Sequence, residues 1–518
     1  MMVRLAVMIR SRSSVVALAI VLLGAIHCVD PEQPVAQPRV VAPNAAFEAP
    51  PEDASALEGW DATLVDCAAP EAAPPPPRVV CDGSDLQCQS LCPNGAFGAM
   101  LSGVVHDPAG KVPVPNAIVY VPKTREALAP LATGVSSCRT CSVEVNGYVS
   151  VAQTNADGTF VLDQVPAGDH IPLVVQAGKW RRSVILDHVV DCMDNAVDPS
   201  LTRLPRNRTE GDLPQMAALT SGCDDMACFL RRVGVDASEF TAPHAGGRVD
   251  VYRGVGGADL GQDAGGRAGD CTNLSCPLWS SKASLEAYDD VLLGCECDGN
   301  NQTKSLAAFV AIHDWLDEGG LLFATHSQVT WFENGLPDFK QLATWTNGPP
   351  SGAPGPFLVN DSFPNASTLL HWLEGLGAAD SNGALGLDPA RVSTSMTAVV
   401  RPALTWVTAE AADVLVDGSP EPTEGPKLVT FPTPVGGIPD AAAPSSCGTA
   451  VVSDVHAGGH GIPGPASIPD GCSTADLSAG ELALEYYLLD SVSACVPPML
   501  GIPPPPPPPP PPPRPGCP

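Results

Sequence analysis

Short runs of alternating apolar and polar residues dominate the chain between residues 98 and 190. Each run has the length and the β-branched content of a strand, and Gly, Pro and Asp separate it from the next run. The dipeptide Asp157-Gly158 favours a tight turn, because it readily adopts the positive φ angles that hairpin turns need. We therefore predict an antiparallel β-sandwich over residues 98–190. Its expected strands are 101–105, 117–121, 147–153, 159–162 and 171–176.

A different rhythm, in which strands alternate with helices, begins at residue 215. Apolar residues at helical spacing fill 304–318, and Gly319-Gly320 ends that helix. Strands that alternate with helices are typical of a mostly parallel sheet covered on both faces. The sequence therefore predicts an α/β domain over residues 215–500. Its expected strands are 216–220, 248–252, 289–293, 321–324 and 448–452, and its expected helices are 224–233, 304–318 and 479–489.

Two proline-rich segments flank these domains, and we expect them to be disordered. Residues 29–80 are rich in Pro, Ala and Glu, which is typical of an extended linker. The tail, residues 501–518, contains an unbroken proline run that forms a polyproline II rod. This rod either binds an aromatic groove or acts as a stiff spacer, and we favour the spacer. A cysteine-rich segment, 81–97, and a second linker, 191–214, complete the predicted multidomain organisation.

Residues 1–28 predict export from the cytoplasm. Three arginines precede the apolar run 15–26, a pattern that is typical of an export signal and too short for a membrane span. Cys28 stands where a bacterial lipoprotein signal has its lipidated cysteine, although His27 is a poor fit before it. Plain secretion and a lipid anchor are therefore both open, and we expect membrane contact only through Cys28. The expected location is extracytoplasmic: secreted, periplasmic or anchored at the cell envelope.

The amino-acid composition agrees with this location and argues against one class of binding partner. The chain of 518 residues has a net charge of −30 and only 27 Lys and Arg. This balance argues against a nucleic-acid partner, since phosphate binding needs a basic surface. The densest basic cluster, residues 179–182, is expected to pair with the protein's own carboxylates. Eighteen cysteines in an oxidising compartment indicate disulfides, and the close candidates are Cys81/Cys88/Cys92, Cys138/Cys141, Cys223/Cys228 and Cys271/Cys276.

Two stretches within residues 98–190 resemble a known domain. The sequence SGVVHDPAGKVPVPNAIVYVP at 102–122, followed by TNADGTFVLDQVPAGDHIPLVVQAGKW at 154–180, is similar to the carboxypeptidase regulatory-like, transthyretin-type domain. The resemblance implies a stable sandwich that secreted proteins use as a spacer or a binding module. It carries over no catalytic residues.

Three segments of the second domain are similar in order to the class I glutamine amidotransferase-like architecture, and most similar to its ThuA-like branch. They are YDDVLLGCE at 288–296, DEGGLLFATHSQ at 317–328 and GTAVVSDVHAGGH at 448–460. In amidotransferases, the strand that corresponds to 321–324 runs into a tight elbow that carries a nucleophilic cysteine. Thr325-His326-Ser327 stands at that elbow here, so the resemblance does not imply amidotransferase activity. ThuA-like proteins often have a histidine at this position.

The carboxyl ends of the predicted parallel strands should meet at one edge of the sheet, where ligands bind in open α/β sheets. The candidate site residues that follow these strands are Cys295, His326, Asp454 and His456. A thiol, a carboxylate and two imidazoles support general acid–base catalysis, nucleophilic attack by Cys295 with the assistance of a histidine, or coordination of zinc or copper. The pattern does not fix a cofactor.

Each candidate also has a structural explanation. Cys295 and Cys297 can be tied into disulfides, which would remove the nucleophile, and we favour this in an exported protein. His326 can satisfy backbone groups at the end of a strand. Asp454 and His456 form the stronger pair, because alternate residues of a strand face the same side. His460 either joins a metal cluster or belongs to a glycine-rich loop.

Two hypotheses of function follow. In the first, which we favour, the protein is an exported, disulfide-containing envelope or surface protein with a binding or structural role toward a protein or glycan partner. In the second, it is an extracytoplasmic hydrolase or carbohydrate-modifying enzyme, metal-dependent or not, that takes a small-molecule ligand at the strand ends. The two-domain layout resembles bacterial secreted proteins without established activity, some of which are labelled tryptophan synthase alpha chain. That label does not fit, because such an enzyme is a cytosolic barrel of eight βα units.

Overall fold

The computed structural model describes most of the chain between residues 85 and 489. The described residues are 85–93, 95–135, 145, 147–262, 264–297, 304–346, 352, 355–410, 415–416, 419–420, 425–435, 447–458 and 467–489, and all of them belong to the compact unit Pro76–Pro518. The expected export signal with Cys28, the linker 29–80 and the tail 501–518 lie outside these residues. So do Cys81, Cys138, Cys141 and His460. In the described part of the chain, no helix is long and apolar enough to span a membrane.

Two mainly antiparallel sheets form the first part of the described chain. Their strands are β1 (Ala99–Val104), β2 (Ile118–Pro122), β3 (Tyr148–Gln153), β4 (Thr159–Val165), β5 (Gly168–Ala177), β6 (Trp180–Val189), β7 (Asp194–Ala196) and β8 (Gly211–Asp212). One sheet has the order β4-β1-β7, and the other has the order β3-β2-β5-β6-β8. The neighbours β1 and β7 pair in parallel, and the others pair antiparallel.

Alternation of buried and exposed residues explains why these segments are strands. In β4, Phe160 and Leu162 are buried while Val161 and Asp163 are exposed, so one face of the strand packs into a core. The predicted turn before β4 is present, and Gly158 adopts a φ of +73° there. The five expected strands correspond to β1 through β5, whereas the alternating pattern does not predict β6, β7 and β8.

The segment 191–214, which the sequence predicts to be a linker, contains ordered elements. It forms β7, β8 and a short helix, α1 (Pro199–Thr202), and the two strands extend the two sheets. Asn195 holds β7 in place: its side-chain amide donates to the carbonyl of Met100 at 3.2 Å and accepts from the N–H of Val190 at 2.8 Å. Short polar strands have no apolar alternation, so periodicity gives no signal for them.

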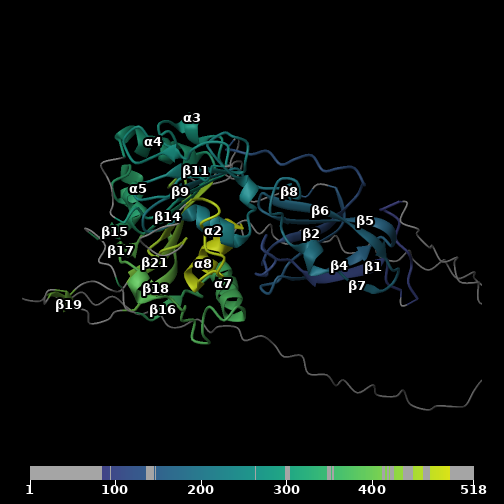
Figure 1. Ribbon diagram of the computed structural model, residues 1–518. Helices are drawn as coiled ribbons and strands as arrows, with labels where there is room; N and C mark the ends of the chain where they lie inside the picture. The colour runs from purple at the N-terminus through teal and green to yellow at the C-terminus, as the bar shows by residue number, and fades with distance from the viewer. Residues whose placement is uncertain are drawn as a thin grey trace, which may run out of the picture. The chain divides into compact units, whose positions relative to one another are not determined.

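A mixed sheet of ten strands forms the centre of the second part (Figure 1). Its strands are β9 (Met216–Thr220), β10 (Phe240–Thr241), β11 (Val249–Arg253), β12 (Gly269–Asp270), β13 (Asp290–Leu293), β14 (Leu321–Thr325), β16 (Phe357–Val359), β18 (Leu404–Ala409), β21 (Gly425–Thr433) and β22 (Gly448–Ser453). The order is β10-β11-β9-β13-β14-β22-β21-β18-β16, and β12 pairs with β11.

Parallel and antiparallel pairing occupy different parts of this sheet. The neighbouring strands β10, β11, β9, β13, β14 and β22 pair in parallel, and β12 pairs in parallel with β11. The strands β21, β18 and β16 continue the sheet with antiparallel pairing. The five expected parallel strands are present, but the sequence pattern does not predict the antiparallel edge. Two further pairs, β15 (Ala343–Trp345) with β17 (Met396–Val399) and β19 (Leu415–Val416) with β20 (Ser419–Pro420), form small separate sheets.

Helices cover both faces of the ten-stranded sheet. They are α2 (Met226–Val233), α3 (Lys282–Leu285), α4 (Leu306–Asp317), α5 (Thr330–Glu333), α6 (Pro337–Lys340), α7 (Pro364–Gly375) and α8 (Ala479–Leu488), with the 3-10 turns η1 (Ala237–Glu239), η3 (His326–Val329) and η4 (Pro389–Arg391). Met216 and Ala218 of β9 join the core that contains α2, α7 and α8, while Ala217 and Leu219 join the core that contains α4. Both faces of the sheet are therefore buried, as is usual for parallel strands.

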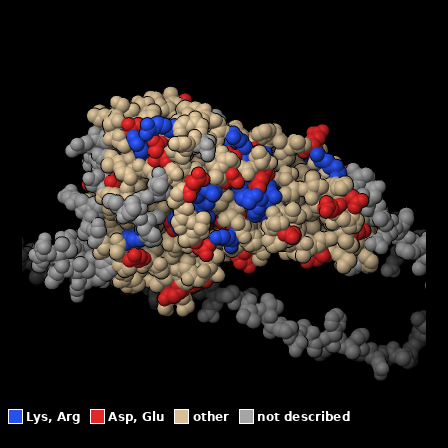
Figure 2. Space-filling view, viewed as in Figure 1, with Lys and Arg blue, Asp and Glu red and all other residues tan. Residues whose placement is uncertain are grey.

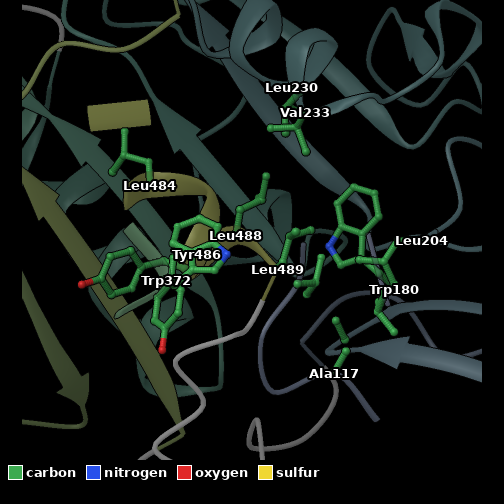
Figure 3. Packing of buried hydrophobic residues seen from close by; sticks show 14 of the residues in the cluster. Ala117, Trp180, Leu204, Leu230, Val233, Trp372, Leu484, Tyr486, Leu488 and Leu489 are labelled. Atoms are coloured by element: carbon green, nitrogen blue, oxygen red, sulfur yellow. The ribbon is translucent and has the colours of Figure 1, made fainter. Parts of the chain in front are cut away.

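Capping residues stand at the ends of the helices. The side chain of Ser305 accepts the N–H of Ala308 at the start of α4, and Asp225 accepts the N–H of Cys228 at the start of α2. Gly234, with a φ of +113°, ends α2 in the left-handed conformation. Figure 3 shows Trp372 of α7 beside Tyr486 of α8, and their ring centroids are 5.5 Å apart.

Four disulfides join described cysteines, and three of them link distant parts of the sequence. They are Cys92–Cys192, Cys223–Cys297, Cys228–Cys472 and Cys271–Cys276. The expected pair Cys271–Cys276 is confirmed, whereas Cys223 and Cys228 do not bond to each other. Cys228 belongs to the buried face of α2, while Cys223 lies in the loop before that helix, so the two sulfurs meet different partners. Disulfides persist in oxidising environments, which fits an extracytoplasmic protein.

Several basic side chains pair with carboxylates of the protein. Figure 2 shows blue and red groups next to one another on the face in view. In the cluster 179–182, Lys179 contacts the carboxylate of Asp289, and Arg181 pairs with Asp212 at 2.6 Å. This pairing confirms, for Lys179 and Arg181, the expectation that the cluster meets the protein's own carboxylates, whereas Arg182 donates to the backbone carbonyls of Ser200 and Arg203.

We predict that Glu485→Gln stabilises the protein at neutral pH. Burial raises the pKa of Glu485 in α8 well above its usual value, as does the nearby carboxyl of Asp107, whose own pKa burial raises to about 6. The folded chain therefore keeps a proton that the unfolded chain releases above about pH 4.5, so the stability falls as the pH rises. We expect Glu485→Gln to raise the free energy of unfolding at pH 7.5 by about 1 kcal/mol or more, and to have little effect at pH 4.5.

Denaturant titrations at the two pH values measure this difference. Glu374→Gln, on the partly exposed surface of α7, is the matched control and should leave the stability within about 0.5 kcal/mol at both pH values. A Glu485→Gln variant that is less stable than the wild type at pH 7.5 would contradict the prediction.

Candidate functional site

Four parallel strands deliver four reactive side chains to the same edge of the sheet. The strands β9, β13, β14 and β22 lie side by side, so their carboxyl ends meet. Asp224 follows β9, Cys295 follows β13, His326 follows β14 and His456 follows β22. One donor atom each from Cys295, His326 and His456 lies within 4.8 Å of the other two. Of the four site residues predicted from the sequence, Cys295, His326 and His456 therefore come together.

Cys295 is a buried thiol that forms no disulfide. Its Sγ lies 2.9 Å from Nδ1 of His326 and 3.2 Å from Oγ of Ser327, and the N–H of Cys297 donates to it at 3.3 Å. Burial, with a smaller contribution from the carboxylate of Asp224, raises the pKa of the Cys295 thiol to about 12. The expectation that Cys295 and Cys297 are both tied into disulfides is right for Cys297 and wrong for Cys295.

His326 occupies the tight turn that the sequence predicts after β14. Its φ of +46° lies in the left-handed region, which is uncommon for a residue other than glycine. The ring is buried, and its Nε2 has no hydrogen-bond partner among the described residues. Burial, with a smaller contribution from the neighbouring His456, lowers the pKa of His326 to about 4. The thiol and this imidazole are thus both neutral near pH 7 when no ion is bound.

His456 is oriented by a buried carboxylate. Its Nδ1 lies 2.8 Å from Oδ1 of Asp224, and the hydrogen-bond network assigns the proton to Nδ1, which leaves Nε2 as an acceptor. The rings of His326 and His456 are 4.4 Å apart between centroids and tilted by 31°. His456 is the more accessible of the two, with 16% of its side chain exposed.

Asp224 links the strand ends to one another. Besides His456, its carboxylate accepts the hydroxyl of Thr325 at 2.5 Å, the N–H of Ala457 at 3.1 Å and the N–H of Cys295 at 3.4 Å. Asp224 is not among the site residues predicted from the sequence, because an aspartate just before a helix is also an ordinary helix start. Its position after a predicted parallel strand is the signal that could have identified it.

Asp454 does not join this cluster. Its Oδ2 accepts the N–H of Ser395 at 2.8 Å, and its Oδ1 accepts the hydroxyls of Ser393, at 3.0 Å, and of Ser395. It is fully buried beside Lys427, and burial raises its pKa. The expected pairing with His456 assumes that strand alternation continues through residue 456, but β22 ends at residue 453. Asp454 and His456 therefore face different surroundings.

A buried ion pair supports the loop that carries Cys295. The carboxylate of Glu296 lies 3.1 Å from Nζ of Lys304, and each side chain is only 1% exposed. Gln328 donates both to that carboxylate and to the carbonyl of Gly294, at 3.3 and 2.9 Å. These bonds fix the residues on both sides of Cys295, so the position of its sulfur is well defined.

The donor set is suited to a transition-metal ion. One sulfur and two imidazole nitrogens are typical ligands of zinc and copper. Two donors on one zinc ion lie about 3.5 Å apart. The three donor atoms lie within 4.8 Å of one another, and Sγ of Cys295 is already 2.9 Å from Nδ1 of His326, so an ion at this cluster would require small shifts of these side chains. His456 can use Nε2, since Asp224 occupies Nδ1. Such a carboxylate behind a histidine ligand is common at metal sites and fixes the direction of the ring.

We predict that Lys304→Met lowers the free energy of unfolding by about 3–5 kcal/mol, because it leaves the carboxylate of Glu296 buried without its counter-charge. The double variant Glu296→Gln/Lys304→Met should recover most of this loss. Urea titrations followed by tryptophan fluorescence measure both effects. As a control, Lys282→Met breaks an exposed pair with Glu318 and should cost less than about 1 kcal/mol. Equal effects of Lys304→Met and Lys282→Met would contradict the prediction.

Comparisons with known proteins bring no further indication of function. No protein-family model, no curated protein and no solved structure matches the chain. They therefore neither support nor contradict the resemblances to a carboxypeptidase regulatory-like domain and to the ThuA-like branch. The strongest indication of function is the chemical character of Cys295, His326 and His456 at the edge of the parallel strands.

Proposed function

We propose that this is an exported protein that binds one zinc ion through Cys295, His326 and His456, and that it is a metal-dependent hydrolase. The observation that carries the proposal is the convergence of three donor atoms, within 4.8 Å of one another, from three neighbouring strand ends. Export is supported by the signal-like residues 1–28 and by the disulfides.

Burial of the donors favours a metal over a purely structural role. The Nε2 atom of His326 is buried without a hydrogen-bond partner among the described residues, and an unsatisfied buried polar atom costs about 1–3 kcal/mol. Coordination would also satisfy the sulfur of Cys295, because a coordinating thiol loses its proton.

The number of ligands favours hydrolysis. Catalytic zinc sites have three protein ligands and keep a fourth position for water, whereas structural sites use four protein ligands. When bound, zinc lowers the pKa of such a water to about 7 and so supplies a nucleophile. His456 is on the exposed side of the cluster, so the open position would face a ligand from solvent. A small polar molecule, such as an ester or a glycan substituent, fits this chemistry.

A second candidate function is nucleophilic catalysis by Cys295. The distance of 2.9 Å between its Sγ and Nδ1 of His326 is suited to a thiol–imidazole pair. The neutral state of both groups and the complete burial of the thiol weigh against it, since the thiolate is the nucleophile. The two candidates differ in whether the wild-type protein contains a metal.

The remaining assignments are proposals of the same kind. The two mainly antiparallel sheets within residues 99–212 support a carboxypeptidase regulatory-like sandwich, which would present the protein to a protein or glycan partner. The parallel strands with His326 at the turn after β14 support a ThuA-like relationship for the second domain. The polyproline tail would act as a spacer in the cell envelope.

Metal content tests the proposal. We expect the exported protein, purified without chelator, to contain about one zinc ion per chain by native mass spectrometry and elemental analysis. Cys295→Ser and the double variant His326→Ala/His456→Ala should lose this ion. His371→Ala, which removes an exposed histidine from α7, is the matched control and should keep it.

Cobalt substitution identifies the ligands directly. A thiolate-to-cobalt charge-transfer band should appear in the wild type and in His371→Ala and disappear in Cys295→Ser. A wild-type protein that takes up neither zinc nor copper would overturn the proposal and favour the thiol chemistry. Copper in place of zinc would overturn the hydrolase and favour an electron-transfer or copper-binding role.

A further inference from the structure

The disulfide Cys223–Cys297 joins the two loops that build the candidate metal site. Cys223 directly precedes Asp224, which orients His456, and Cys297 follows Cys295 by two residues. The bond thus links the loop after β9 to the loop after β13. None of the other three disulfides between described cysteines involves these two loops.

Hydrogen bonds connect the same two loops, and they depend on the same close approach. The N–H groups of Cys223 and Asp224 both donate to the carbonyl of Cys295, at 3.2 and 3.1 Å. A Cβ atom at Gly294 would lie only 2.7 Å from the carbonyl oxygen of Asp224, so this position requires glycine. The geometry of the site therefore depends on close packing between these two loops, and it would be lost if they separated.

Cys297 is held in a conformation that it would not adopt freely. Its φ of +72° lies in the left-handed region, which costs a residue other than glycine about 1 kcal/mol or more. In this conformation, its N–H points at Sγ of Cys295 and donates to it at 3.3 Å. Without the disulfide, Cys297 could relax and withdraw this hydrogen bond from the sulfur that would ligate the metal.

We infer that the Cys223–Cys297 disulfide is a redox gate on the metal site, so that the site binds zinc tightly only after the pair is oxidised. The inference rests on the proposed function. Oxidation has two effects: it fixes Asp224 and the N–H of Cys297 against the ligands, and it removes two thiols that would compete for the ion. The gate would prevent tight metal binding at this site in the reducing cytosol and permit it after export.

The chemistry of the gate is a thiol–disulfide exchange. A disulfide-form oxidant, such as oxidised glutathione or an oxidised protein dithiol, first forms a mixed disulfide with one of the two cysteines and releases a thiol. The second cysteine then attacks the mixed disulfide, which forms the Cys223–Cys297 bond and releases the second thiol of the oxidant. The pair loses two electrons and two protons, and the oxidant gains both. Cys295 takes no part and remains a thiol.

Zinc affinity of a disulfide variant tests the inference. Competition with a chromophoric chelator on the full chain should give a zinc affinity about 10- to 100-fold weaker for Cys223→Ser/Cys297→Ser than for the wild type, the range expected when the partners of metal ligands are lost. The matched control, Cys271→Ser/Cys276→Ser, removes a disulfide that involves neither of these loops and should change the affinity less than about twofold.

If the disulfide acts by positioning Asp224, the losses of zinc affinity caused by the two sets of substitutions should not add. Asp224→Asn should weaken zinc binding by itself, and combining it with Cys223→Ser/Cys297→Ser should add little if the disulfide acts through Asp224. If the serine variant does not fold, the wild type can be equilibrated in glutathione buffers of increasing reducing power. The zinc affinity should then follow the fraction of the Cys223–Cys297 bond, measured by peptide mass mapping.

The outcomes separate the inference from the function on which it rests. Unchanged or tighter zinc binding by the serine variant, or an affinity that does not follow the bond in glutathione buffers, overturns the gate and leaves the metal site intact. Failure of the oxidised wild type to bind zinc overturns the proposed function itself.

Discussion

The buried carboxylate of Asp224 is the interaction on which the site depends. A charged group without hydrogen bonds or a counter-charge is unfavourable in a protein interior, and Asp224 has both, since Arg391 also lies 4.0 Å from its Oδ1. Its partners come from the ends of three neighbouring strands: Cys295 after β13, Thr325 at the end of β14, and His456 with Ala457 after β22. One side chain thereby sets the distances between loops that are far apart in the sequence.

The sequence predicts the parallel half of the central sheet well, because strands that are buried on both faces are continuous apolar runs. The same logic places Cys295, His326 and His456 at a common edge, since each follows such a run. It does not extend to Asp454, which lies beyond the end of β22 and turns toward Ser393 and Ser395. Alternation is a property of strands and gives no direction for residues in the loop that follows.

Other features leave no local trace in the sequence. The antiparallel strands β16, β18 and β21 extend the sheet beyond β22. β21 is almost entirely buried, but Pro426, Lys427 and Pro432 weaken its strand pattern in the sequence. The bonds Cys223–Cys297 and Cys228–Cys472 join cysteines 74 and 244 residues apart, and such pairing follows from the tertiary fold alone. The role of Asp224 depends on three strand ends at once, so it too becomes visible only in the folded chain.

The site combines buried polar groups that would each be unfavourable alone and that a bound cation would stabilise together. A buried thiol, two adjacent imidazoles and a buried carboxylate are costly when isolated, but a cation would give the sulfur and both rings a common partner. X-ray absorption spectroscopy of the zinc-loaded protein tests this account most directly. The account predicts one sulfur at about 2.3 Å and two imidazole nitrogens at about 2.0 Å from the metal. A first shell without sulfur, or with two or more sulfurs, would contradict it.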